Sequence, residues 1–264
     1  QGELVTPIFV KSNGKVTTKW VYAESEEANR HFDQLIPAFY SHLKSKGWSN
    51  IWLQHVCDEP LSEIQSKQIS RMYKRILKDM PGVRTLDAGS HQLTNFKENE
   101  MRIYCPQLDD YERNRNGYNT VNKSNLGIDV WMYTCVNPQG NYMTRIADYP
   151  LLSARVMGWY IWQQGLKGYL HWGWNLWNQA VYSRNDPFYD MYCDSAAGDA
   201  FLVYPDSANM SVFEGPRSTS VRDSWEDYEL LMLASKKNAS KTKQIVDTVV
   251  KSGDNFIRDN KKLI

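Results

Sequence analysis

The chain has 264 residues, with 31 lysines and arginines against 30 aspartates and glutamates, so its formal net charge is +1. This length is enough to bury about three quarters of the unfolded surface in one large domain or two small ones. The charge shows no basic excess of the kind that nucleic acids or anionic membranes attract, and no apolar run of about eighteen residues predicts a membrane span. The ten tryptophans and sixteen tyrosines favour a carbohydrate or another ring-shaped ligand, because their apolar faces suit sugars.

The N-terminal part of the sequence predicts a hairpin and a helix. Residues 1–23 carry two apolar runs around Asn13-Gly14, which is a strong turn signal between strands. Residues 24–46 place apolar side chains at spacings of three and four, which predicts an amphipathic helix that ends at Gly47. Pro37 lies inside this helix and is expected to kink it or split it in two.

Residues 24–177 repeat a pattern of strand, polar loop and mostly helical return. The expected strands begin at residues 51, 84, 101, 129 and 168, and further helices are expected over 61–80 and 150–164. Such repetition predicts a parallel sheet in an α/β fold. We expect a (β/α)8, TIM-barrel-like fold of which this chain supplies strands four to eight, with the earlier strands upstream of Gln1 or missing from the chain. An open doubly wound sheet is the second possibility, although no Gly-rich phosphate loop follows any strand.

The last part of the sequence, residues 178–264, predicts a loop, a short strand and closing helices. The strand is expected over 199–204 and the helices over 220–234 and 236–263. We therefore expect residues 1–264 to form a single barrel domain.

Two adjacent carboxylates, Asp58 and Glu59, follow the strand that begins at Ile51. In α/β folds the chemistry lies just beyond the carboxyl ends of strands, which is where this pair falls. Pro60 disfavours a helical backbone at Glu59 and is expected to keep that residue extended. The alternative is that the two acids only cap the helix that follows.

The other strand ends supply mainly aromatic and amide side chains. If all strand ends face one pocket, it also contains Ser90, His91, Gln107, Tyr133, Trp172, Trp174 and Asn175. The chain shows no Ser-His-Asp order and no Cys or His spacing typical of zinc, so we expect neither a metal nor a cofactor. A carboxylate pair in an aromatic cleft is typical of glycoside hydrolysis.

The later strand ends carry no acid that could act as the nucleophile of an ordinary retaining glycosidase, about 5 Å from the acid catalyst. Asp109 and Asp110, in the expected loop past their strand, are the alternative as a conventional nucleophile. Two adjacent carboxyls allow another mechanism, because one can protonate the leaving oxygen while the other orients a group of the substrate. This arrangement is needed when the substrate's own 2-acetamido oxygen is the nucleophile.

Four segments resemble glycoside hydrolase family 123, the N-acetyl-β-galactosaminidases, and a related domain of unknown function. They are the "DEP" strand end at 55–60, the Trp-rich strand at 168–177, the segment Gly198-Asp199-Ala200 to Pro205, and the helix that begins Arg222-Asp223-Ser224. Ala200 and Ser224 each stand where the family motif has a glycine.

The resemblance implies a retaining, substrate-assisted hydrolysis of terminal β-linked N-acetylgalactosamine, or of N-acetylhexosamine more broadly, through an oxazolinium intermediate. Glu59 would be the general acid and then the base, and Asp58 would hold the acetamido group. The residues implied in substrate binding are Tyr133 (on position alone), Trp172 and Trp174 as the sugar platform, Asn175, His55 and Gln107.

The same resemblance implies a partner and a location. The partner would be a glycan or glycolipid that ends in N-acetylhexosamine, and the protein would be secreted, periplasmic or on a bacterial cell surface. The alternative function is a non-catalytic carbohydrate-binding domain that kept the barrel without a complete cleft.

Overall fold

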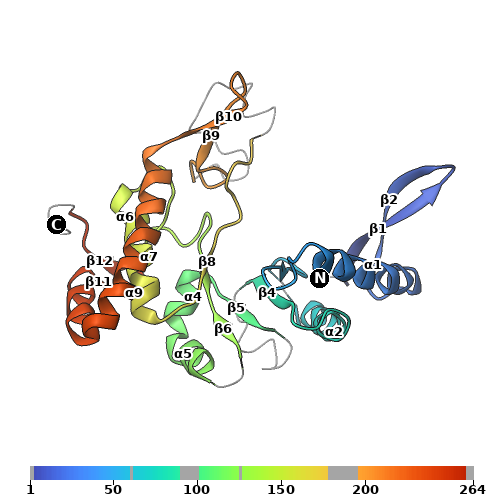
Figure 1. The fold of residues 1–264 in the computed structure, drawn as a ribbon, viewed down its shortest axis with the longest axis horizontal. Helices are drawn as coiled ribbons and strands as arrows, with labels where there is room; N and C mark the ends of the chain where they lie inside the picture. The colour runs from blue at the N-terminus through green and yellow to red at the C-terminus, as the bar shows by residue number, and fades with distance from the viewer. Residues whose placement is uncertain (1–2, 60–61, 90–100, 125–126, 178–195, 260–264) are drawn as a thin grey trace. The chain divides into compact units, whose positions relative to one another are not determined.

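The computed structural model describes residues 3–59, 62–89, 101–124, 127–177 and 196–259 (Figure 1). The chain divides into two compact units. The first comprises Gln1–Cys105 and Lys123–Asp129, and the second comprises Pro106–Asn122 and Val130–Ile264.

The first unit begins with an antiparallel hairpin of β1 (Val5–Ser12) and β2 (Lys15–Tyr22), which Figure 1 shows as a two-stranded ribbon. Asn13 and Gly14 form the turn with φ of 49° and 78°, the left-handed conformation that a two-residue hairpin requires. The predicted hairpin is therefore confirmed.

Helix α1 (Glu26–Ser45) begins at Ser25, whose hydroxyl accepts a hydrogen bond from the Ala28 amide at 3.1 Å. It runs through Pro37 as one element, so the predicted split is wrong. A proline removes only one backbone donor, and the apolar face of the helix is held on both sides of it by buried Ile36 and Leu43. The predicted end at Gly47 is confirmed, since Gly47 has a φ of 70° just after the helix.

A sheet in the order β3-β4-β5-β6 forms the centre of the first unit, with strands β3 (Leu53–Gln54), β4 (Arg84–Ala88), β5 (Ile103–Cys105) and β6 (Asp129–Val130). The pairs β3–β4 and β4–β5 are parallel, which confirms the predicted parallel sheet. The strand predicted from Ile51 is reduced to two residues. Helix α2 (Glu63–Asp79), capped by the Ser62 hydroxyl, connects β3 to β4 and packs Ile76 against the apolar face of α1.

The second unit contains a further parallel pair, β7 (Met132–Tyr133) and β8 (Tyr169–Leu170), connected by the helices α6 (Leu151–Arg155) and α7 (Met157–Gln164). Two helices that the sequence did not predict, α4 (Leu108–Arg113) and α5 (Arg115–Lys123), follow β5. The rings of Tyr111, Tyr118 and Tyr160 meet in the core at centroid distances of 5.8 and 6.2 Å. Burial of these rings explains why a polar, loop-like stretch is helical.

The C-terminal part differs from the prediction in its boundaries. The hairpin of β9 (Val203–Asp206) and β10 (Ser211–Glu214) replaces the single strand expected over 199–204. Helix α9 (Pro216–Val249) spans both predicted helices, with a kink at Asn238, where φ is −156°. A second hairpin, β11 (Val250–Ser252) and β12 (Asn255–Phe256), takes the place of the last helical turns.

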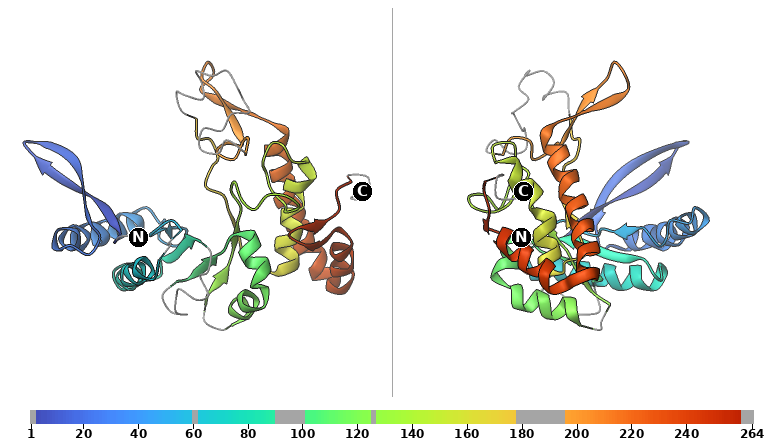
Figure 2. Two further views of the ribbon diagram at one scale, coloured as in Figure 1. Left: turned by 180° about the vertical axis from the view of Figure 1, so that it is seen from behind. Right: turned by 60° about the vertical axis from the view of Figure 1, so that its left-hand side comes forward.

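Helices α7 and α9 pack at close range and run side by side in both views of Figure 2. The Gly158 amide donates a hydrogen bond to the Ser224 hydroxyl at 2.7 Å. A Cβ atom at Gly158 would lie 2.0 Å from the Ser224 carbonyl oxygen, a distance that no real contact allows. The close approach of the α9 backbone at Ser224 therefore requires glycine on the facing helix.

We predict that Gly158→Ala lowers the free energy of unfolding by about 1–3 kcal/mol or more, because the two helices must separate. Denaturant unfolding followed by circular dichroism measures this loss. Ser240→Ala, at an exposed position of α9, is the control and should change stability by no more than about 0.5 kcal/mol. Equal stability of Gly158→Ala and the parent would contradict the packing.

Candidate active site

Asp58 and Glu59 lie beside the carboxyl end of β4, in the segment that follows β3. The Glu59 amide donates a hydrogen bond to the carbonyl oxygen of Ala88, the last residue of β4, at 3.2 Å. Both acidic residues are exposed. Their carboxylates are thus presented to solvent at a strand end of a parallel sheet.

Pro60 led us to expect an extended backbone at Glu59, and the structure shows that this prediction is wrong. Its φ is 41°, in the left-handed region that costs a non-glycine residue about 1–3 kcal/mol. The hydrogen bond to Ala88 fixes the chain at this turn, and that tertiary contact outweighs the local preference. Pro60 itself lies outside the described residues.

A buried carboxylate, Asp87 of β4, lies behind this segment. Its Oδ1 accepts a hydrogen bond from the Val56 amide at 2.6 Å and lies 3.3 Å from His55 Nε2. Its Oδ2 accepts from the hydroxyl of Tyr73, and the Cys57 amide is a further donor. Burial raises the pKa of Asp87 to about 6, against the lowering effect of these donors.

Sequence reasoning missed Asp87, although a signal was available. It is the one carboxylate in a five-residue strand that is otherwise almost entirely buried. An acid at such a position must find donors, so it identifies a polar contact of the sheet.

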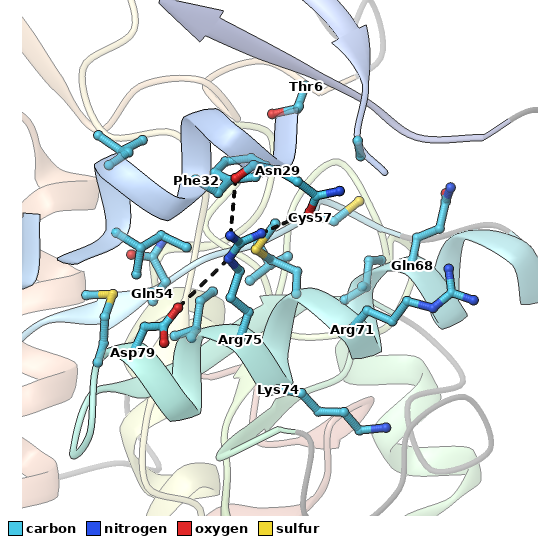
Figure 3. A pocket seen from close by; sticks show the side chains of 18 of the residues that line it. Thr6, Asn29, Phe32, Gln54, Cys57, Gln68, Arg71, Lys74, Arg75 and Asp79 are labelled. Carbon is cyan, nitrogen blue, oxygen red and sulfur yellow. Dashed lines mark hydrogen bonds and ion pairs between the residues drawn. The ribbon is translucent and has the colours of Figure 1, made fainter. Parts of the chain in front are cut away.

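The first unit also contains a cavity of about 1140 Å³ (Figure 3). Its lining comes from β1, α1, α2 and residues 52–57, and includes His55 and Cys57 but neither Asp58 nor Glu59. The Arg75 guanidinium lies at its centre, where it donates to Asn29 at 3.0 Å and pairs with Asp33 and Asp79. Its charge is therefore already balanced by the protein.

The second unit contains the remaining candidates, beginning with Tyr133 and Gln107. These two residues form an isolated parallel bridge, in which the Tyr133 amide donates to the Pro106 carbonyl oxygen at 3.0 Å. Gln107 Nε2 donates to the Asn137 carbonyl oxygen at 3.3 Å. Tyr133 is 4% exposed, which limits the part of its side chain that a ligand can reach.

Trp172 and Trp174 present apolar rings to solvent, being 45% and 54% exposed. Asn175 is exposed beside them and forms an isolated bridge with Phe201. The Leu202 amide donates to the Trp174 carbonyl oxygen at 2.7 Å, so this segment is fixed to the chain that leads into β9. The predicted platform residues are therefore adjacent and accessible.

A buried polar cluster of Arg145, His171 and Asp199 fixes the indole of Trp172. The Trp172 indole N–H donates to Asp199 Oδ2 at 2.7 Å, and Asp199 Oδ1 lies 3.1 Å from His171 Nε2. Arg145 donates to His171 Nδ1 at 2.6 Å, which places the imidazole proton on Nε2, facing Asp199. Burial lowers the pKa of His171 to about 4 and that of Arg145 to about 10.

The sequence suggested a loop for Asp109 and Asp110, but both residues lie in the first turn of α4. Asp109 pairs with Arg113 at 2.6 Å, and fully buried Asp110 accepts a hydrogen bond from the Tyr118 hydroxyl at 2.7 Å. Helix formation and these partners give both acids structural roles, which speaks against either as a conventional nucleophile.

The candidates therefore fall into two groups, each placed by its own unit. Asp58, Glu59 and His55 belong to the first, whereas Gln107, Tyr133, Trp172, Trp174 and Asn175 belong to the second. Ser90 and His91 lie outside the described residues.

In the part of the chain that the structure describes, no three His, Cys, Asp or Glu side chains are grouped as metal ligands. Among the same residues, no helix is both long and apolar enough to cross a membrane.

Comparison with known proteins identifies a family and a similar fold. The profile of the glycoside hydrolase 123 catalytic domain matches residues 6–234. The fold is similar to that of a family 123 glycoside hydrolase from Clostridium perfringens, whose structure was analysed for the details of glycolipid glycan hydrolysis. The TM-score is 0.70 at 20% sequence identity, and the match covers 92% of this chain and 42% of that one, so this chain spans less than half of its relative. Curated protein sequences give no significant match.

The lowered pKa of His171 predicts a dependence of stability on pH. Because the unfolded chain protonates this imidazole more readily, its contribution is fully present above about pH 6.5 and is lost as the pH falls towards 4. The stability advantage of the parent over His171→Gln should shrink by about 3 kcal/mol between pH 7 and 4.

Denaturant unfolding of both proteins across this pH range measures that difference. Trp172→Phe, which loses the neighbouring indole donor but keeps His171, should retain the pH dependence of the parent. If the difference in free energy of unfolding between the parent and His171→Gln is constant with pH, the predicted role of His171 is wrong.

Proposed function

The chain belongs to the glycoside hydrolase 123 catalytic domain family, and on that premise we propose that it removes terminal β-linked N-acetylgalactosamine, or N-acetylhexosamine more broadly, with retention of configuration. The observation that carries the proposal is the adjacent, exposed pair of Asp58 and Glu59 beside the end of β4. The helical environment of Asp109 and Asp110 adds support, because it leaves the substrate's acetamido group as the better nucleophile.

In the proposed mechanism Glu59 first protonates the glycosidic oxygen. The acetamido oxygen of the substrate attacks the anomeric carbon as the bond to the leaving group breaks, and an oxazolinium ion forms. Asp58 accepts a hydrogen bond from the acetamido N–H and stabilises the developing positive charge. Glu59 then takes a proton from the water that opens the ring, so two inversions give net retention.

The proposal includes the substrate-binding residues predicted from the sequence. Trp172 and Trp174 would offer apolar ring faces to the sugar, and Asn175 would bond a hydroxyl. Gln107 and Tyr133 would contribute polar atoms to substrate binding, and His55 would support the acidic pair.

The substrate and location of the protein are part of the same proposal. The similar Clostridium perfringens enzyme was studied for its hydrolysis of glycolipid glycans, which supports a glycan or glycolipid substrate here. A secreted, periplasmic or cell-surface location would give access to it.

We also propose that the parallel strands are consecutive strands of a (β/α)8 barrel. The parallel pairs β3–β4, β4–β5 and β7–β8 support this, as does the parallel bridge between Gln107 and Tyr133. In such a barrel the strand ends face one side, which is where the catalytic and binding residues are needed.

The second candidate function is a non-catalytic carbohydrate-binding domain. The observation that favours it is the exposed segment of Trp172, Trp174 and Asn175. Its own backbone hydrogen bonds and the Trp172 contact to Asp199 hold this segment without any contribution from the acidic pair at 58–59.

The test is release of p-nitrophenol from the β-N-acetylgalactosaminide and the β-N-acetylglucosaminide. We expect the parent to turn over, Glu59→Gln to lose about 100- to 10,000-fold in rate, and Asp58→Asn about 100- to 1,000-fold. A thiazoline analogue of the oxazolinium should inhibit the parent. Asp109→Asn is the control, and it should retain the activity of the parent.

Two other outcomes would exclude the mechanism. Full activity of Asp58→Asn would point to a separate nucleophile. A parent that binds the sugar saturably but never hydrolyses it would establish the binding domain instead.

A further inference from the structure

We propose that Asp87 is the positioning residue of the Asp58–Glu59 pair, and that its carboxylate holds residues 55–57 in the conformation from which the pair projects. The inference rests on the proposed function only for its effect on turnover. The contact itself is a property of the first unit and can be tested without substrate.

The contacts of Asp87 reach the segment directly before the acids. The Val56 amide donates to Oδ1 at 2.6 Å, the Cys57 amide is a second donor, and His55 Nε2 lies 3.3 Å from the same oxygen. Asp58 is the next residue along the chain. One carboxylate thus engages three consecutive residues that lead into the acidic pair.

The next residue of β4 extends this attachment. The carbonyl oxygen of Ala88 accepts a hydrogen bond from the Glu59 amide at 3.2 Å. Asp87 and Ala88 together fix both ends of the turn that carries Asp58. The left-handed backbone of Glu59 is set by these two anchors, because local sequence preference would not choose it.

Asp87 is itself fixed from behind by α2. The hydroxyl of Tyr73, a fully buried residue, donates to Oδ2, so that the carboxylate cannot rotate away from the segment. The same helix is held against α1 through Ile76. Rigidity is therefore transmitted from the core of the first unit to the acidic pair.

The burial of a carboxylate at this position needs a reason, since an apolar side chain would fill a strand interior at lower cost. Asp87 is 0% exposed. Among the described residues, the donors that compensate it include the segment at 55–57 and Tyr73. The arrangement makes sense if the orientation of that segment is what the buried charge provides.

Acid gives a way to release the contact in the unmodified protein. Among the described residues, the titratable groups that interact with Asp87 include His55, Cys57, Tyr73 and Cys105. Burial raises the pKa of Cys57 to about 11 and raises those of Tyr73 and Cys105 further. The two thiols and the phenol are thus neutral near pH 6, where Asp87 titrates. A protonated Asp87 can donate from Oδ2 to the Tyr73 hydroxyl, and its Oδ1 then accepts from the Val56 amide without a negative charge. Hydrogen bonds to a neutral carboxyl are weaker than those to a carboxylate, so protonation weakens the contact to residues 55–57.

Protonation of Asp87 affects the position of residues 55–57 and the stability of the fold in opposite directions, so the two effects can be told apart. A carboxyl with a raised pKa contributes stability below its unfolded value of 3.8, and this contribution is lost as the pH rises through about 6. Acidification towards pH 5 therefore loosens residues 55–57 while the contribution of Asp87 to global stability increases. Loss of activity through unfolding would require the opposite sign.

The first experiment measures amide hydrogen exchange at Val56 and Cys57 by NMR in the full chain, with Asp87→Asn beside the parent. Protection of both amides should fall at least about 10-fold in Asp87→Asn, and in the parent it should fall as the pH drops below about 6. Thr85→Val is the matched control. Thr85 is equally buried on β4, but its hydroxyl accepts from the Arg102 amide at 3.1 Å, so Val56 and Cys57 should stay protected.

The second experiment measures turnover of the p-nitrophenyl substrate. Asp87→Asn should lower kcat about 10- to 100-fold, the cost of a small misplacement, with KM within about threefold of the parent. Its kcat should also lose the acidic limb near pH 6. Tyr73→Phe, which keeps the carboxylate, should fall between parent and Asp87→Asn in both kcat and amide protection.

Unchanged protection of Val56 and Cys57 in Asp87→Asn would overturn the inference, whatever the activity. An inactive parent whose amides respond as described would refute the proposed function and leave the contact established. If Asp87→Asn does not fold, Tyr73→Phe and the pH series of the parent decide in its place. Full protection of the Val56 and Cys57 amides in Tyr73→Phe and in the parent below pH 6 would reject the positioning role.

Discussion

A buried carboxylate bonded to an exposed segment is the interaction on which the candidate site depends. Asp87 accepts hydrogen bonds from residues that lead into Asp58 and Glu59, while α2 holds its other oxygen through Tyr73. Desolvation of such a charge costs several kcal/mol, and the donors offset that cost only when they keep their geometry. The rigidity of the segment is thus a consequence of the burial of its anchor.

In the second unit, too, a buried carboxylate fixes an exposed part of the chain, but its partners are different. Asp199, also fully buried, accepts the indole N–H of Trp172 and leaves the ring exposed. The guanidinium of Arg145 supplies a buried positive charge close by, and its hydrogen bond to His171 fixes the tautomer that faces Asp199. An exposed aromatic ring is thereby held at one edge by a polar contact, which suits the role in sugar binding that we propose for it.

Local signals sufficed for the elements that local forces decide. The Asn13-Gly14 turn, the end of α1 at Gly47 and the strand Arg84–Ala88 were all predictable from the sequence. Helix α4 and the left-handed Glu59 were not, because aromatic burial and the bond to Ala88 decide them from far along the chain. The acidic pair could be found from its place after an apolar run. Asp87 could not be connected to it before β3 and β4 were known to be parallel neighbours.

The two buried clusters respond to acid in opposite directions. Burial raises the pKa of Asp87 to about 6, so protonation of this carboxylate favours the folded state. His171 lies beside the Arg145 guanidinium in a desolvated site, so its pKa falls to about 4, and protonation favours unfolding of the second unit. As the pH falls from about 6 to about 4, the contribution of His171 to stability decreases and that of Asp87 increases, yet the Asp87 contact to residues 55–57 weakens. Mild acid therefore disturbs the position of Asp58 and Glu59 before it unfolds the sheet behind them.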